Sequence, residues 1–127
     1  MGFDAIKWVV GRSLSRCGSL SEATAFTTSP LLMNASDRAA FGRVEGAVRL
    51  TRYGGDCYSY CMLAAGHLDL VVETELKPYD IAALIPIITG AGGVVTTWDG
   101  QPAQNGGRII AAGDPRVHEA AIKLLNS

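Results

Sequence analysis

Residues 73–93 read ETELKPYDIAALIPIITGAGG, and the remaining segments are interpreted around this stretch. Pro78 fits the first turn of a helix, because the N–H that proline lacks would have no partner there. Asp80 then falls in the same turn, near the partial positive charge of the helix end. From Ile81 to Ile88 no residue is charged or strongly polar, which predicts a helix buried on all sides. Pro86 lies within this apolar run and predicts a kink in the helix.

Strand and helix patterns alternate on both sides of this stretch. About five strands are expected, at Ala23–Thr28, Arg49–Tyr53, Leu68–Glu73, Val94–Thr97 and Arg108–Ala112, with a further short candidate at Ile6–Val10. Three helices join the one at Pro78: one capped by Asn34 or Ser36 and running to about Val48, one from the turn at 54–56 to Ala65, and one from Asp114 to about Leu125. This alternation predicts an α/β fold in which a sheet of about five strands is covered by helices on both sides, with residues 1–127 as a single domain.

Composition excludes several classes of protein. With 127 residues and 48% hydrophobic residues, the chain can bury the core of one globular domain. A net charge of -1 and a pI near 6.1 argue against a nucleic-acid partner. The longest strictly apolar run is too short to span a bilayer, and no signal segment opens the chain. Cys17, Cys57 and Cys61 show no zinc spacing and are expected to be reduced and mostly buried, which is typical of a cytoplasmic protein.

Glu73 and Asp80 are the first candidates for a functional site. Glu73 ends an expected strand, and Asp80 starts the helix that follows. In α/β sheets, ligands bind at the carboxyl ends of strands, beside helix N-termini. Two carboxylates in that place suit a hard metal ion and a hydroxyl or amine group. The alternative is that Asp80 only stabilises the helix end, which is the more frequent role of an acid in a first turn.

The sequence Gly54-Gly55-Asp56 is the second candidate. Paired glycines let backbone N–H groups approach a substrate, and the helix that follows favours an anion. The alternative is a tight turn from strand to helix in which Asp56 is only the cap. The pattern alone does not decide between these interpretations.

Other polar and small residues indicate structural roles. Cys57 and Cys61 lie four residues apart, on one face of the expected helix, and favour core packing. His67 and His118 have no obvious acidic partner in the sequence, so both are expected at the surface. Residues 90–93 follow a helix, so this glycine-rich segment predicts a close-packed helix exit and no phosphate loop.

Taken together, residues 68–94 closely resemble the C-terminal signature of the inositol monophosphatase superfamily. In that signature an aliphatic strand ending in Glu precedes an aspartate helix and Ala-Gly-Gly, and Tyr79 replaces the usual tryptophan. Three further stretches resemble the branch that hydrolyses histidinol phosphate: LSEAT at 20–24, TTSP at 27–30 and RYGGDCY at 52–58. The resemblance extends from about Ser19 to Leu125.

This resemblance implies hydrolysis of a small-molecule phosphomonoester by water activated with magnesium (Mg2+), without a covalent enzyme intermediate. It assigns Asp80 as a ligand of one Mg2+ ion and Glu73 as the acid that holds the non-phosphate part of the substrate. Gly54, Gly55 and Asp56 match the segment that lines the same end of the pocket. No catalytic residue is expected within this chain.

The departures from the family pattern also carry expectations. The family's other metal ligands, a glutamate and the Asp-Pro-Ile/Leu-Asp-Gly-Thr loop, lie in an N-terminal half, and nothing in these 127 residues resembles them. Because one carboxylate cannot complete a magnesium site, the isolated chain is expected to be inactive and to bind magnesium weakly. It should also expose an apolar interface and form a homo-oligomer. Glu75 stands where the histidinol branch usually carries glycine.

Three functions remain open at this point. The leading one is the C-terminal domain of a magnesium-dependent histidinol-phosphate phosphatase. The second is a non-catalytic half-protein that self-associates. The third is a phosphatase of a sister branch, acting on inositol or nucleotide phosphates.

Overall fold

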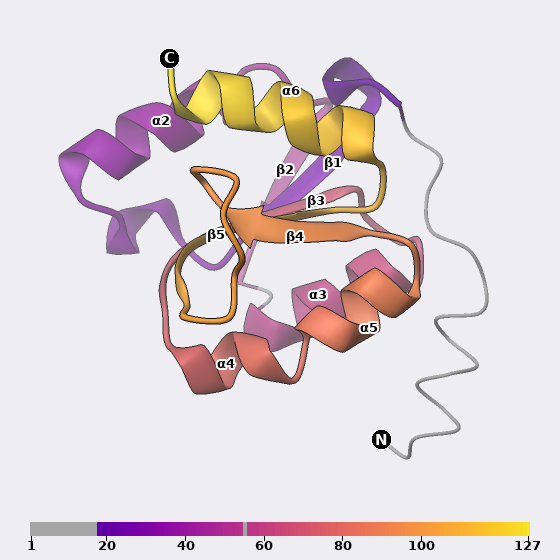
Figure 1. The fold of residues 1–127 in the computed structure, drawn as a ribbon. Coiled ribbons are helices and arrows are strands. Elements are labelled where there is room, and N and C mark those ends of the chain that lie inside the picture. Colours follow the sequence, from indigo (N-terminus) through magenta and orange to yellow (C-terminus); the bar gives the residue numbers. More distant parts are fainter. Residues whose placement is uncertain (1–17, 55) are drawn as a thin grey trace.

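The computed structural model describes residues 18–54 and 56–127 and shows one sheet between two layers of helices (Figure 1). Helices α2 and α6 cover one face of the sheet, and α3, α4 and α5 cover the other. The predicted α/β fold, with helices on both sides of a five-stranded sheet, is therefore confirmed. The strand candidate at Ile6–Val10 lies outside the described residues. Within the described ranges, no helix combines the length and the apolar character needed to cross a bilayer.

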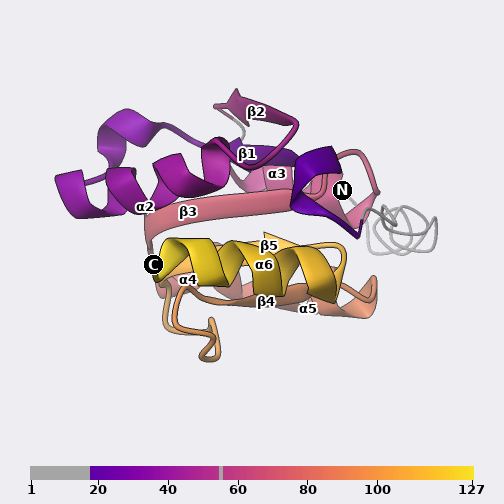
Figure 2. The same ribbon diagram turned by 90° about the horizontal axis from the view of Figure 1, so that it is seen from above.

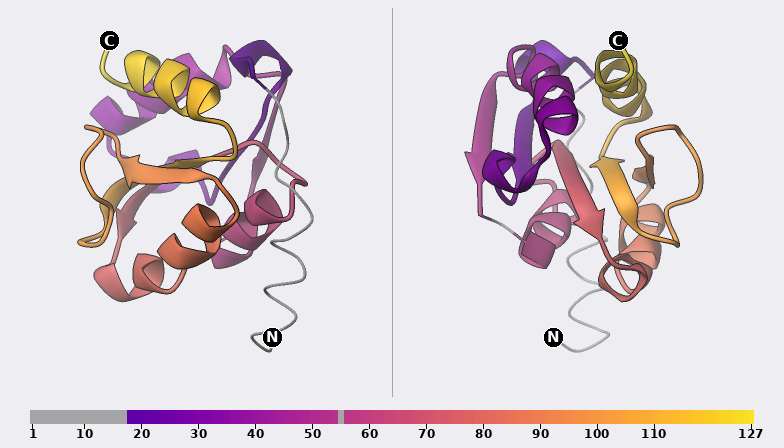
Figure 3. Two further views of the ribbon diagram at one scale, coloured as in Figure 1. Left: turned by 45° about the vertical axis from the view of Figure 1, so that its right-hand side comes forward. Right: turned by 90° about the vertical axis from the view of Figure 1, so that its left-hand side faces the viewer.

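The sheet has the strand order β2-β1-β3-β5-β4. Strand β1 pairs in parallel with both β2 and β3, whereas β5 is antiparallel to β3 and to β4 (Figure 3). The carboxyl ends of β1, β2 and β3 therefore meet at one edge of the sheet. The strands are β1 Thr24–Thr27, β2 Leu50–Tyr53, β3 Leu70–Leu76, β4 Val94–Thr97 and β5 Gly107–Ala112.

The helices begin where the sequence provides caps. The Asn34 side chain accepts a hydrogen bond from the N–H of Asp37 at 2.7 Å, and Asp114 accepts one from the N–H of Arg116 at 2.8 Å. The predicted caps are thus confirmed. The helical elements are η1 Leu20–Glu22, η2 Pro30–Leu32, α2 Ala35–Glu45, α3 Asp56–Ala64, α4 Pro78–Ala82, α5 Ile85–Gly90 and α6 Pro115–Leu125.

Alternating side chains of the strands pack into two separate hydrophobic cores, one on each face of the sheet. Leu70 and Val72 of β3 pack on one face, beneath α2 and α6, which lie side by side (Figure 2). Val71 lies between them in sequence and packs on the other face, with Ile81 of α4 and Ile88 of α5. The period of two along β3 therefore sets which helices each side chain meets.

The prediction of one kinked helix buried on all sides is wrong. Residues 78–90 form two short helices, α4 and α5, and Pro86 is the second residue of α5. Proline cannot donate a backbone hydrogen bond, so a continuous helix is interrupted before it. In the run from Ile81 to Ile88, only Ile81, Leu84 and Ile88 are buried. An apolar run can still have an exposed face where its residues are small, because alanines such as Ala82 expose little apolar area.

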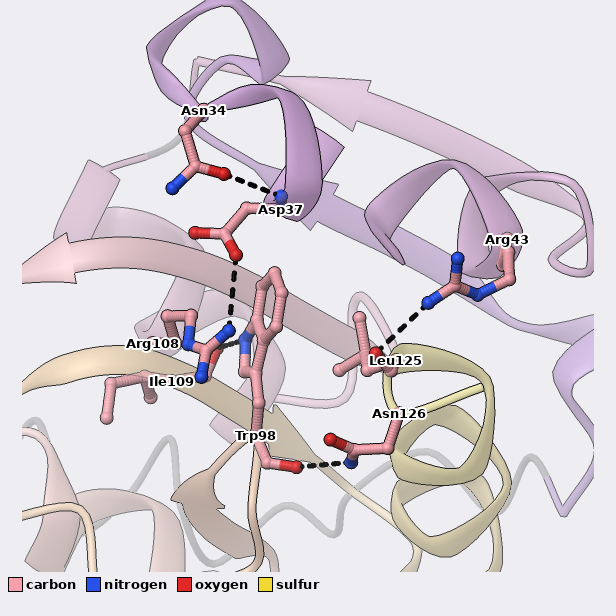
Figure 4. Close-up of polar contacts among 8 residues, drawn as sticks. All are labelled: Asn34, Asp37, Arg43, Trp98, Arg108, Ile109, Leu125 and Asn126. Carbon is pink, nitrogen blue, oxygen red and sulfur yellow. Dashed lines mark hydrogen bonds and ion pairs between the residues drawn. The ribbon is translucent and has the colours of Figure 1, made fainter. Parts of the chain in front are cut away.

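A network of polar contacts joins the first helical layer to the β4–β5 end of the sheet (Figure 4). The buried Trp98 donates from Nε1 to the carbonyl of Ile109 at 3.1 Å. The Arg108 guanidinium lies over the Trp98 ring, 5.4 Å from its centroid, and pairs with Asp37 of α2 at 3.2 Å. Asn126, which follows α6, donates to the carbonyl of Trp98 at 2.8 Å. The network therefore holds α2 and the end of α6 against strands β4 and β5.

Candidate functional site

The candidate site lies at the edge where the three parallel strands end. Gly54 follows β2, and its N–H donates to the carbonyls of Thr27 at 3.1 Å and Thr28 at 2.9 Å. Its φ of +86° is a conformation that glycine adopts at little cost. The end of β2 is thereby tied to the end of β1, and the chain turns into α3.

The predicted segment 54–56 is described only in part. The N–H of Gly54 is already hydrogen-bonded within the chain, so it is not available to a substrate. The space beside Gly54 is open, because a Cβ there would meet no atom within 4 Å. Gly55 lies outside the described residues. Helix α3 begins at Asp56, as expected, but the side chain of Asp56 lies outside what the structure describes.

Glu73 is a buried carboxylate in β3. Its residue is 5% exposed, and its Oε1 accepts a hydrogen bond from Oγ1 of Thr28 at 2.7 Å. Burying a carboxylate is costly unless hydrogen bonds compensate for the lost water. Thr28, at the end of β1, supplies such a bond and fixes one oxygen of the acid. Strand β3 continues to Leu76, so the expectation that Glu73 ends its strand is wrong. Glu73 lies in the middle of β3, level with the residue that follows β1, and its carboxylate has a defined orientation.

A β-bulge separates Glu73 from the helix that carries Asp80. The pairing of β3 with β5 shifts register between Glu73 and Leu76, and Glu75 has a φ of +57°. Such an irregularity bends a strand and increases its twist. The chain then enters α4 directly, at Pro78. This bend leads from the buried Glu73 to the exposed start of α4.

Asp80 has the helix-stabilising role that was its alternative interpretation, and its role as a metal ligand stays a prediction. Its Oδ2 accepts a hydrogen bond from the N–H of Lys77 at 3.1 Å, so it does stabilise the start of α4. The residue is exposed, and within the described part of the chain its Oδ1 has no hydrogen bond. One oxygen is thus held by the backbone while the other faces solvent. The capping role leaves one oxygen able to bind a cation.

Tyr60 of α3 is a member of this site that the sequence analysis did not identify. Its hydroxyl is buried and has no hydrogen-bond partner among the residues described. Burial, followed by the negative charges of Glu73 and Asp80, raises the pKa of the Tyr60 hydroxyl well above its ordinary value of 10.0. The phenol therefore stays protonated at neutral pH. Its signal in the sequence is its position one helical turn after Asp56.

The described residues do not form a complete metal site. They contain no group of three His, Cys, Asp or Glu side chains that could hold an ion. Asp80 can supply one oxygen, whereas magnesium requires near-octahedral oxygen coordination. The donor type fits a hard cation, but this part of the chain contributes only a fraction of its ligands.

The expectation for His118 is wrong, and the expectation for the cysteines can be compared with the structure only at Cys61. His118 is half-buried and its Nε2 lies 2.8 Å from Oγ1 of Thr96, so the expectation of a surface residue is wrong. Burial lowers the pKa of His118 below its ordinary value of 6.5. Cys61 is partly buried, while Cys17 and the side chain of Cys57 lie outside the described part.

Two expectations for residues outside the site are met. His67 is exposed, as expected. The helix exit at Gly93 is closely packed, because a Cβ there would lie 2.9 Å from the carbonyl oxygen of Ala112. The glycine-rich segment after α5 therefore has the predicted structural role.

The fold and the site define a layered α/β domain with one carboxylate buried in β3 and one exposed in α4, and comparison with known proteins identifies its family. Residues 8–127 match the inositol monophosphatase family. The chain is 41% identical over 122 residues to the bifunctional phosphatase IMPL2, chloroplastic, of Arabidopsis thaliana, and 35% identical over 125 residues to a histidinol-phosphatase of Streptomyces coelicolor. An inositol monophosphatase structure from Zymomonas mobilis superposes with a TM-score of 0.86 at 42% identity. The chain belongs to the inositol monophosphatase family.

The matches cover most of this chain but less than half of each relative. They span 89% of the chain and 35% of the Arabidopsis protein, and 91% of the chain and 47% of the Streptomyces protein. The Zymomonas structure gives 91% and 47%. The described site therefore corresponds to part of a longer protein in these relatives.

Proposed function

We propose that this chain is the alcohol-binding domain of a metal-dependent phosphomonoesterase, with Mg2+ as the ion. The observation that carries the proposal is the placement of two carboxylates: a buried, hydrogen-bonded Glu73 level with the end of β1, and Asp80 in α4, the helix that follows β3, with one oxygen that has no described hydrogen bond. Ligands bind at the carboxyl ends of strands in α/β sheets. The remaining metal ligands belong, in this proposal, to an N-terminal half like that of the longer relatives.

Each residue then has a defined role. Asp80 binds the ion through Oδ1, while the N–H of Lys77 holds Oδ2. Glu73 accepts a hydrogen bond from a hydroxyl or amine of the substrate. Gly54, Gly55 and Asp56 line the same end of the pocket. When bound, Mg2+ supplies charge stabilisation and an activated water.

Histidinol phosphate is the substrate that this pocket favours. Histidinol carries an amine that is cationic at neutral pH, whereas inositol offers only neutral hydroxyls. With Glu73 and Asp56 at the same end of the pocket, an ammonium would meet two carboxylates, and charge-assisted hydrogen bonds are the strong ones. The similarity to a histidinol-phosphatase supports this choice. Inositol phosphate is the second candidate, supported by the Zymomonas structure.

The substrate is tested in a chimera that joins this chain to the part of the Zymomonas mobilis protein it does not cover. Asp56→Ala should lower kcat/KM for histidinol phosphate by about 10- to 100-fold and for inositol phosphate by much less, because only the amine loses a charged partner. Asp99→Ala, at an exposed aspartate of a remote turn, is the matched control. Equal losses on both substrates would return Asp56 to the role of a helix cap.

A non-catalytic, self-associating half-protein is the second candidate function. It is supported by exposed apolar groups: Leu31 is 79% exposed and Tyr79 is 77% exposed. Such surface favours association with another chain. Light scattering on the 127-residue chain should show dimers or larger species at micromolar concentrations. A monomeric mass throughout would contradict this alternative.

A further inference from the structure

A pocket with a volume of about 300 Å³ lies at the β2 edge of the sheet. Strand β2 is the outermost strand on that side, while helix α3 packs against β1 and β3 (Figure 3). The volume is at the lower end of the range for pockets that hold small molecules. The residues that line the pocket are Thr24, Phe26, Arg52, Met62, His67 and Leu68.

This pocket lies toward the amino ends of the parallel strands, away from the candidate site. Thr24 is the first residue of β1, and His67 and Leu68 precede β3. Glu73 instead lies level with the residue that follows β1. None of the residues that line the pocket has a role in the proposed function.

One part of the pocket is apolar. Phe26 of β1, Met62 of α3 and Leu68 belong to the hydrophobic core on the α3 side of the sheet. Leu68 is buried, whereas Phe26 and Met62 remain partly exposed. Covering such apolar surface is favourable. The pocket can therefore hold the apolar part of a ligand.

The polar part of the pocket offers hydrogen-bond donors and no acidic group. Arg52 and His67 are exposed, and neither side chain has an ion pair or a hydrogen bond in the part of the chain that the structure describes. Arg49 donates to Oγ1 of Thr24 at 3.0 Å, which leaves the hydroxyl proton of Thr24 to donate. Asp69 accepts a hydrogen bond from the N–H of Thr24 at 2.8 Å and does not line the pocket.

We propose that this pocket binds a small carboxylate that carries an apolar group. The planar guanidinium of Arg52 matches a carboxylate, and bonds between two charged groups are the strong ones. Thr24 and His67 donate to the same anion, and the apolar group covers Phe26 and Met62. A neutral alcohol lacks the charge for Arg52, while inorganic phosphate leaves the apolar part uncovered.

The binding is tested with hydrocinnamate, a carboxylate with one phenyl ring, added to the 127-residue chain. NMR of the methionine methyl groups should show saturable binding with a Kd of roughly 0.1 to 5 mM. The methyl signal of Met62 should shift, whereas that of Met33, in the core on the other face, should not. Hydrocinnamyl alcohol, which has the same ring and no charge, should bind at least about 5-fold more weakly. Inorganic phosphate should leave the Met62 signal unchanged.

Two exposed positions test the donors without disturbing the core. Arg52→Met keeps an unbranched side chain and should weaken hydrocinnamate by about 10-fold or more, while changing the affinity for the alcohol less than about twofold. His67→Ala should weaken hydrocinnamate by about 2- to 5-fold. Arg38→Met, at an exposed arginine of α2, is the matched control and should leave both affinities unchanged.

Four outcomes would contradict this site. They are no saturable binding of hydrocinnamate up to about 20 mM, equal affinity for the alcohol or for inorganic phosphate, an unchanged Met62 signal at saturation, and unchanged binding in both Arg52→Met and His67→Ala. None of them bears on Glu73 or Asp80, so a failure here leaves the proposed function to its own tests.

Discussion

Glu75 has the left-handed backbone conformation, with a φ of +57°. For a residue with a side chain this region costs roughly 1–2 kcal/mol relative to the ordinary regions. Its position in the bulge between Glu73 and Leu76 makes glycine the residue that this backbone conformation suits best. Glu75 stands out in the sequence, but only the backbone angle gives its physical meaning.

Replacing Glu75 with glycine should relieve this strain. Glycine gains freedom in the unfolded chain, which offsets about 0.5–1 kcal/mol of the benefit. Glu75→Gly should therefore raise the free energy of unfolding by up to about 1 kcal/mol, measured by urea denaturation. Glu75→Val is the contrasting variant and should lower it, because a β-branched side chain suits this region least. A destabilised Glu75→Gly would contradict the strain argument.

His118 should make stability depend on pH. Thr96 donates from Oγ1 to the carbonyl of Thr97, so it accepts the hydrogen bond from Nε2 of His118. Burial lowers the pKa of His118 below the ordinary value of 6.5, so the unfolded chain binds the proton more readily. Its contribution is complete above pH 6.5 and is lost as the pH falls from there through the pKa of the folded state.

The measurement is the free energy of unfolding between pH 5 and 8. His118→Gln should flatten the rise in stability with increasing pH near pH 6.5. His67→Gln, at an exposed position, is the control for loss of an imidazole. The same slope in wild type and His118→Gln would show that His118 does not couple folding to pH.

At the scale of elements, the sequence predicted those helix starts that depend on residues close together in the chain. The sequence predicted the starts of α2, α4 and α6. Asn34 and Asp114 each accept a hydrogen bond from a backbone N–H within three residues, and Pro78 has no N–H that would need a partner. The interruption before α5 was missed, because an apolar run does not show how much of each helix face a neighbour covers. Tyr60 and Thr28 were missed as site residues because the contacts that define their roles come from other strands and helices.

Arg43 joins the two helices of the first layer. Its guanidinium donates to the carbonyls of Leu124 at 2.6 Å and Leu125 at 3.2 Å, at the C-terminal end of α6. Figure 4 shows the contact with Leu125. Arg43→Met should lower the free energy of unfolding by about 1–2 kcal/mol, since bonds from a charged donor are stronger than neutral ones. Arg38→Met, which removes one exposed bond to Pro30, should cost about 0.5 kcal/mol or less. Equal effects in chemical denaturation would contradict the link between the helices.

At the scale of the whole molecule, the sequence predicted the layers, the sheet and the family, since these follow from alternating patterns and one ordered signature. The site could be predicted only in part. Glu73 and Asp80 are seven positions apart and mark their own strand and helix. The described residues contain no complete set of metal ligands, and the matches cover less than half of each relative described above.

The central claim is that this chain supplies Asp80 as a metal ligand and Glu73 as the alcohol acceptor of a longer phosphatase. The most direct measurement compares magnesium-dependent hydrolysis of histidinol phosphate by the isolated chain, by the Zymomonas chimera and by the chimera carrying Asp80→Asn. The account predicts no turnover above background for the isolated chain and clear turnover for the chimera. It predicts a loss of about 100-fold or more in Asp80→Asn, since even residues that only support metal ligands cost 10- to 100-fold. A folded but inactive chimera, or an Asp80→Asn chimera with unchanged activity, would contradict it.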